Sequence, residues 1–152
     1  MPFPRRERSR TVTAMEILAP APPALAARHF VAKLAFETDP ADLAVELART
    51  STKVIPVDAR QPAGYAAGHL PGALNLPHAS IDEASTAHLD RSAVYVTYCW
   101  GPACNASTKA AAKLAGLGFS VKELIGGISA WAAEGFEVAG GGASVEPVAC
   151  AC

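Results

Sequence analysis

The sequence lacks the features that would point to a membrane, a nucleic acid or a bound metal. No run of about 18 apolar residues occurs in the 152-residue chain, so we expect no membrane-spanning helix. The 13 basic and 14 acidic residues nearly balance, and a net charge of −1 gives no basic surface for nucleic acid. The four cysteines do not follow the usual spacing of zinc ligands, and we expect neither a metal nor another cofactor.

The two ends of the chain differ in composition from its middle. Residues 1–23 begin with a basic segment that imitates a signal peptide, but Glu16 and three prolines interrupt the apolar stretch that such a peptide needs. We expect a disordered lead, with either Met1 or Met15 as its start, and a flexible tail over 139–152. Residues 24–138 then form one domain that begins with a helical extension, and 51% hydrophobic residues suffice for its core.

Short apolar strands alternate with helical stretches through this domain. Strands are expected over 54–58, 73–76, 94–98 and 121–124. Helices are expected over 24–34, after the capping pair Asp39-Pro40, and over about 107–115. This alternation predicts a parallel sheet with helices on both faces and a ligand site beyond the carboxyl ends of the strands. The first helix could also contact a second copy of the chain, so a homodimer is considered.

The most informative segment is 93–107, where an apolar strand ends at Cys99 and a short loop opens a helix. Such a loop aims several backbone N–H groups at its own centre, which makes an anion site. These dipoles favour thiolate over thiol and would lower the pKa of Cys99. Gly101 and Pro102 suit the sharp bends, and Asn105 or Ser107 is the candidate N-cap. The alternative is that Cys99 packs as a small buried side chain.

From about residue 37 to 138 the chain resembles the rhodanese-like domain family, and four blocks in order carry the resemblance. They are the strand Val54–Arg60 ending in Asp-x-Arg, the turn and strand Tyr65–Pro77, the Tyr98-Cys99 pair that opens the loop, and Gly126–Trp131 with its Gly-Gly-x-x-x-Trp pattern. The resemblance implies a three-layer α/β/α fold with a central, mainly parallel five-stranded sheet.

The resemblance also implies a sulfurtransferase. In this family a cysteine attacks the outer sulfur of a donor such as thiosulfate, carries it as a persulfide and passes it to a thiophilic acceptor. Cys99 is the position that matches the catalytic cysteine. The anionic sulfur would then be held by the loop residues Trp100, Gly101, Pro102, Ala103, Cys104, Asn105 and Ala106. The implied partners are a small anionic sulfur donor and a thiol acceptor. Because the signal-peptide interpretation fails, we expect a cytoplasmic location, where cysteines serve chemistry more than structure.

Three features of the loop depart from the simplest family pattern. The loop is about one residue longer than in common members, which approaches the length found in related phosphatases, but Asn105 stands where those enzymes need an arginine, so we do not expect phosphatase activity. No charged residue lies between Cys99 and Ser107, so only backbone dipoles and Lys109 could neutralise a dianionic donor, and weak turnover of thiosulfate is expected.

The third departure is Cys104, which lies inside the loop five residues after Cys99. It is a candidate redox partner, because a disulfide with Cys99 could protect or resolve the persulfide. It could equally pack as a small residue, since spacing alone does not bring two sulfurs within bonding distance. Cys150 and Cys152 in the tail could resolve the persulfide or bind a soft metal, although an untied chain end is the simpler interpretation.

Other residues have a structural interpretation beside a functional one. Asp58 and Arg60 could shape the floor of the site, but a structural ion pair is expected. His69 is expected to hold a turn, Trp131 to lie in the core beside Ile128, and Trp100 to wall the acceptor side or rest on the surface. A second function remains open, a noncatalytic rhodanese module that binds a protein or senses oxidants through Cys99 and Cys104.

Overall fold

The computed structural model describes residues 19–141, which fall into two units, 19–32 and 33–141. The expected lead up to residue 18, both candidate start methionines and the tail cysteines Cys150 and Cys152 lie outside the described residues. Helix α2 (Pro23–Phe36) starts at a proline, whose missing N–H costs nothing in a first turn, and it runs one residue earlier and two later than expected. Its contact with a second copy stays a prediction.

A parallel sheet of five strands organises the second unit, in the order β1-β5-β4-β2-β3. The strands are β1 (Glu37–Thr38), β2 (Val54–Asp58), β3 (Leu74–Asn75), β4 (Val94–Tyr98) and β5 (Ser120–Leu124). Strands β2 and β4 have the predicted bounds, β5 begins one residue earlier, and β3 is two residues shorter. The parallel sheet and the α/β fold class are therefore confirmed.

The helices begin where the chain offers a cap or a proline. They are α3 (Pro40–Leu47), α4 (Pro62–Ala67), α5 (Glu83–Thr86), α6 (Ala106–Gly116) and α7 (Gly127–Ala133), with a short 3₁₀ helix η1 (His78–Ser80). The Asp39 side chain accepts a hydrogen bond from the Asp42 amide at 2.8 Å, as the predicted capping pair requires. Helix α6 begins at Ala106, so Ser107 is not its N-cap. Asn105 occupies that position without a side-chain capping bond.

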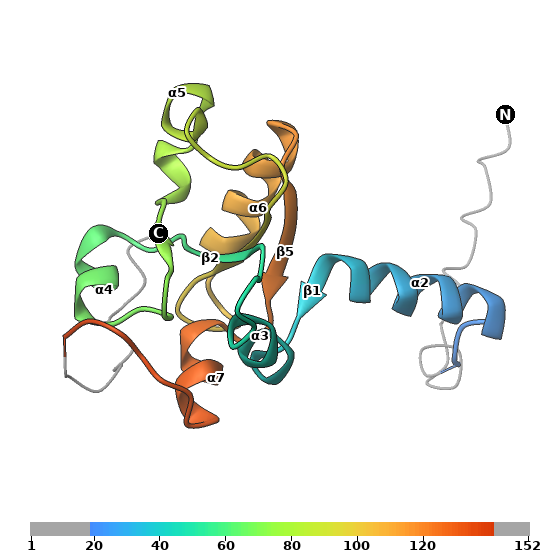
Figure 1. Ribbon diagram of the computed structural model, residues 1–152. Helices are drawn as coiled ribbons and strands as arrows, with labels where there is room; N and C mark the ends of the chain where they lie inside the picture. The colour runs from blue at the N-terminus through green and yellow to red at the C-terminus, as the bar shows by residue number, and fades with distance from the viewer. Residues whose placement is uncertain (1–18, 142–152) are drawn as a thin grey trace, which may run out of the picture. The chain divides into compact units, whose positions relative to one another are not determined.

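The two faces of the sheet carry separate hydrophobic clusters, as the three-layer fold requires. Helix α6 lies on one side of the strands and α3 and α7 on the other (Figure 1). Successive residues of β4 alternate between them: Tyr95 packs with Ala110 and Leu114 of α6, whereas Val96 packs with the cluster that includes Leu43 of α3. Ile128 and Trp131 of α7 belong to this second cluster, which confirms their predicted core position. Within residues 19–141 no helix is long and apolar enough to cross a membrane.

Candidate functional site

Cys99 directly follows β4, and the first turn of α7 holds its backbone in place. The Cys99 carbonyl accepts a hydrogen bond of 2.9 Å from the Ile128 amide. The Trp100 carbonyl accepts two more from Ser129, at 3.0 Å from its amide and 2.6 Å from its hydroxyl. Three donors in the first turn of α7 therefore fix the entrance of the loop against the end of the sheet.

This arrangement depends on the two glycines before α7. Gly126 and Gly127 have φ angles of 76° and 60°, which side chains rarely adopt. A Cβ atom on Gly127 would lie 2.4 Å from the Cys99 carbonyl oxygen, well inside van der Waals contact. The bend at Gly126-Gly127 is thus also a close approach, because the chain after β5 touches the backbone of the cysteine itself.

In this structure Cys99 is joined to Cys104 by a disulfide, which answers the alternative that the sequence left open. Their Cα atoms lie 6.2 Å apart, because a turn in which the Cys104 amide donates to the Gly101 carbonyl at 3.1 Å folds the loop back on itself. That amide is consequently not available to a bound anion. A disulfide sulfur is neither thiol nor thiolate, so the nucleophile predicted at Cys99 exists only in the reduced protein.

A pocket of about 270 Å³ borders the disulfide. Six residues of the predicted site line it: Cys99, Gly101, Pro102, Ala103, Cys104 and Asn105. The two other predicted loop residues lie elsewhere. Ala106 is the first residue of α6 and is buried in the core, and the Trp100 ring stacks on the Arg60 guanidinium, with 4.3 Å between the guanidinium carbon and the ring centroid.

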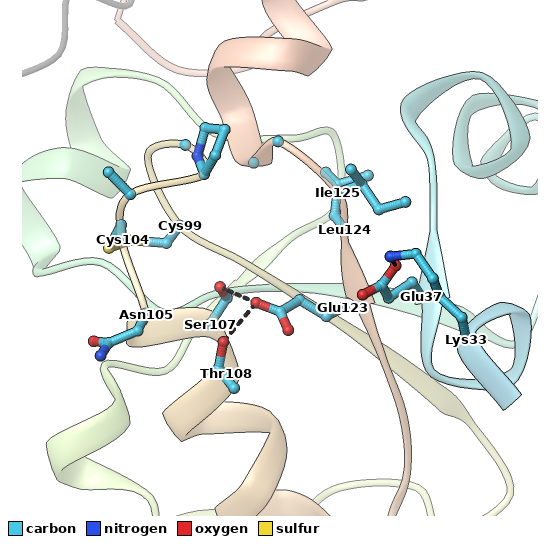
Figure 2. A pocket seen from close by; sticks show the side chains of 15 residues that line it. Lys33, Glu37, Cys99, Cys104, Asn105, Ser107, Thr108, Glu123, Leu124 and Ile125 are labelled. Carbon is cyan, nitrogen blue, oxygen red and sulfur yellow. Dashed lines mark hydrogen bonds and ion pairs between the residues drawn. A yellow bond between two sulfur atoms is a disulfide. The ribbon is translucent and has the colours of Figure 1, made fainter. Parts of the chain in front are cut away.

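The opposite wall of the pocket contains residues that the sequence did not indicate. Glu123 of β5 accepts hydrogen bonds at one carboxylate oxygen from the hydroxyls of Ser107, at 2.6 Å, and Thr108, at 2.9 Å. Figure 2 shows its side chain directed at both hydroxyls in the first turn of α6. A carboxylate at this end of the helix interacts favourably with the helix dipole, so Glu123 stabilises the start of α6 from outside the loop.

The charges around this pocket are mixed. Glu37 pairs with Glu123 across the β1–β5 register and forms an ion pair with Lys33, which also lines the pocket. Lys109, which the sequence offered as a neutralising cation, is not among the lining residues. Of the ionisable side chains that line the pocket within the described part of the chain, two are carboxylates and one is an ammonium group. A dianionic ligand therefore meets little positive charge here.

Beneath the loop lies a buried polar cluster at the ends of β2 and β4. Arg60 donates to Asp58 through Nη2 at 2.5 Å and through Nε at 2.9 Å, and to the Gly68 carbonyl at 2.6 Å. The Tyr98 hydroxyl donates to Asp58 at 2.9 Å and accepts from the Leu70 amide at 3.1 Å. Burial raises the pKa of Tyr98, which keeps this hydroxyl a donor. The predicted structural ion pair of Asp58 and Arg60 is confirmed.

Comparison with known proteins agrees with this geometry. The family model described as a rhodanese-like domain matches residues 39–134. The chain belongs to the rhodanese-like domain family. The predicted family and fold are both confirmed.

Individual relatives show how similar this rhodanese-like chain is to known proteins. The thiosulfate sulfurtransferase GlpE of Pseudomonas putida is 39% identical over 100 residues, which are 64% of this chain and 86% of that one. A crystal structure of a protein from Bacillus halodurans matches with a TM-score of 0.80 at 45% identity and covers 84% of this chain and 96% of its own. A rhodanese-related protein from Thermoplasma volcanium matches with a TM-score of 0.59 at 26% identity over 68% and 97% of the two chains. The predicted enzyme class, a sulfurtransferase, is the class to which the first of these belongs.

Proposed function

We propose that the protein is a sulfurtransferase that moves sulfane sulfur from a donor such as thiosulfate to a thiol acceptor through a persulfide on Cys99. The single observation that carries this proposal is the position of Cys99. Cys99 follows the central strand β4, and its carbonyl is fixed by α7. Its side chain borders the pocket at the carboxyl end of the sheet. In parallel α/β sheets this is the edge where ligands bind.

The reaction consists of two displacements. The reduced Cys99 thiolate attacks the outer sulfur of thiosulfate, the S–S bond of the donor breaks, and sulfite leaves with the bonding electrons. The acceptor thiolate then attacks the outer sulfur of the persulfide, and Cys99 leaves as a thiolate. The proximity of the α6 N-terminus favours the ionised form of Cys99 in both steps.

The charges of the pocket support a donor bound weakly through backbone dipoles. The only cation that lines the pocket in the described part of the chain is Lys33, which is already paired with Glu37. Electrostatic attraction for a dianion is therefore small, and we propose a high KM for thiosulfate. We also propose a cytoplasmic location, because a reducing compartment keeps the Cys99–Cys104 pair open for catalysis.

The test is thiocyanate formation from thiosulfate and cyanide by the protein after reduction and removal of the reductant. We expect thiocyanate and sulfite from the natural chain, a mass increase of one sulfur atom on Cys99 of a Cys104→Ser variant after donor treatment, and activity at the buffer level for Cys99→Ser. A natural chain that neither forms thiocyanate nor releases sulfite from thiosulfate would show that the proposal is wrong.

The disulfide favours one second candidate, a redox sensor that uses no sulfur donor. In that function an oxidant closes the Cys99–Cys104 bond and a reductant opens it, with a partner responding to the state of the loop. The two candidates separate in one experiment. Hydrogen peroxide would link the cysteines in either case, but only a sulfurtransferase releases sulfite when the reduced protein meets thiosulfate without an oxidant.

A further inference from the structure

The loop that presents Cys99 also contains the thiol that can finish the reaction. We propose that Cys104 resolves the Cys99 persulfide within the same chain, so that the protein releases its sulfur as hydrosulfide and is then reset by a dithiol reductant. The inference rests on the proposed sulfurtransferase function, and it names the first acceptor, the product and the class of the second substrate.

The geometry for this step is present in the fold of the loop. The disulfide places the Cys104 sulfur in bonding contact with the Cys99 sulfur, and the turn between Gly101 and Cys104 holds the loop in that shape. In a Cys99 persulfide the same Cys99 sulfur is the inner atom of the S–S bond. Attack by Cys104 on that inner atom yields the bond that the structure contains.

The atoms and electrons of this step balance. The Cys104 thiolate attacks the inner sulfur, a Cys99–Cys104 bond forms, and the bond between the inner and outer sulfurs breaks. The outer sulfur leaves with the electron pair and takes up the proton that Cys104 gave up, so hydrosulfide is released. The sulfane sulfur is reduced to sulfide while the two cysteines are oxidised to the disulfide.

A dithiol then restores the thiols. Cys104 is 9% exposed and Cys99 only 2%, so the reductant reaches the Cys104 sulfur more easily. Attack there expels Cys99 as a thiolate. The second thiol of the reductant displaces Cys104 and completes the exchange. The sum is thiosulfate and a dithiol converted into sulfite, hydrogen sulfide and a disulfide.

The pocket wall suits release of an anion. Glu123 and Glu37 both line the pocket that borders the two cysteines, and their carboxylates oppose the retention of hydrosulfide. An external thiol that carries a negative charge meets the same repulsion. Cys104 pays no cost of association, because the loop already holds this thiol beside Cys99.

The test uses the full chain, reduced and freed of reductant under anaerobic conditions, and mixed with thiosulfate in a single turnover without any external thiol. Sulfite and free sulfide are both measured, and their ratio is the readout, because it does not depend on how fast the donor reacts. For the natural chain we expect about one sulfide per sulfite and a protein that ends with Cys99 bonded to Cys104. For Cys104→Ser and Cys104→Ala we expect a ratio near zero and a persulfide that persists on Cys99.

Two controls make the result specific. Because the chain also ends in Cys150 and Cys152, the double variant Cys150→Ser/Cys152→Ser is measured beside the others, and it is expected to keep the ratio of the natural chain. Cys99→Ser is expected to release neither product.

The possible failures are distinguishable. If the natural chain releases sulfite but keeps its persulfide, or if the Cys104 variants give the same sulfide ratio as the natural chain, the self-resolving step is wrong and the sulfurtransferase proposal stands. If the tail variant loses the sulfide instead, the resolving thiol is misassigned. If the natural chain releases no sulfite and gains no sulfur on Cys99, the proposed function itself fails and this inference fails with it.

Discussion

The guanidinium carbon of Arg60 lies 4.3 Å from the centroid of the Trp100 ring, so the residue next to Cys99 covers a buried cation. Arg60 is 3% exposed, and its Nη1 atom has no hydrogen-bond partner within the described part of the chain. The face of the Trp100 ring therefore stabilises the part of the guanidinium that lacks a hydrogen bond. It also explains why Trp100 turns away from the pocket that its loop neighbours line.

Replacement of Trp100 by alanine is expected to lower the free energy of unfolding by about 1 to 2 kcal/mol, since the cation–π interaction with Arg60 is lost. Trp100→Phe keeps an aromatic face and is expected to lose clearly less. Urea denaturation of both reduced variants measures the difference. Equal losses would mean that an aromatic face over Arg60 contributes nothing to stability.

Gly127→Ala is expected to abolish most sulfurtransferase activity and to destabilise the fold, because the new Cβ would lie 2.4 Å from the Cys99 carbonyl oxygen. Gly135→Ala is a matched control. Gly135 also has a positive φ, 81°, but a Cβ there would meet nothing within 4 Å, so only the backbone penalty of about 1 to 2 kcal/mol applies. Thiocyanate formation and thermal unfolding of the pair separate the clash from the strain. Similar behaviour of the two variants would contradict the close approach.

The sequence predicts the parts of this fold that are encoded locally. Strands β2 and β4 are continuous apolar runs, and Asp39 with Pro40 is a complete helix start, so both features were found with their bounds. Strand β1 was missed, because Glu37 and Thr38 have no apolar pattern and are a strand only through their pairing with β5. Cys99 was found for the local reason that a strand ends where a loop and a helix begin.

The rest of the site depends on contacts across the chain. Glu123 lies in β5, 16 residues after its partner Ser107. From the sequence alone, a glutamate in such a strand is expected to face solvent. The disulfide between Cys104 and Cys99 depends on a turn of the loop. The spacing of the two cysteines in the sequence does not determine the geometry of that turn. The direction of the Trp100 ring depends on Arg60, 40 residues earlier in the chain. Tertiary contacts of this kind leave no periodic signal in the sequence.

Glu123→Gln is expected to lower the pKa of the Cys99 thiol, because it removes a negative charge from the pocket that Cys99 lines while an amide oxygen can still accept from Ser107 and Thr108. The experiment needs a Cys104→Ser background, in which Cys99 is a free thiol. Alkylation of Cys99 near neutral pH should accelerate roughly two- to fivefold, and its pH profile should move to lower pH. Glu134→Gln, an exposed carboxylate beyond α7, is the control and should change neither. An unchanged rate in the Glu123 variant would mean that this carboxylate does not act on Cys99.

Tyr98 is expected to limit the stability of the protein at alkaline pH. Burial raises the pKa of its hydroxyl in the folded state, whereas the unfolded chain ionises at about pH 10. Above that pH the unfolded state binds fewer protons than the folded state, so stability is fully present below about pH 10 and falls as the pH rises further. Tyr98→Phe should flatten this fall without removing it, since the pKa of Tyr95 is raised by burial as well.

At neutral pH the same Tyr98→Phe variant should be less stable by about 1 to 3 kcal/mol, because Asp58 loses a donor and the Leu70 amide an acceptor. Urea denaturation between pH 8 and 11, a range chosen to bracket the ordinary tyrosine pKa of about 10, measures both effects. A slope identical to that of the natural chain would show that Tyr98 ionises in the folded protein as readily as in the unfolded one.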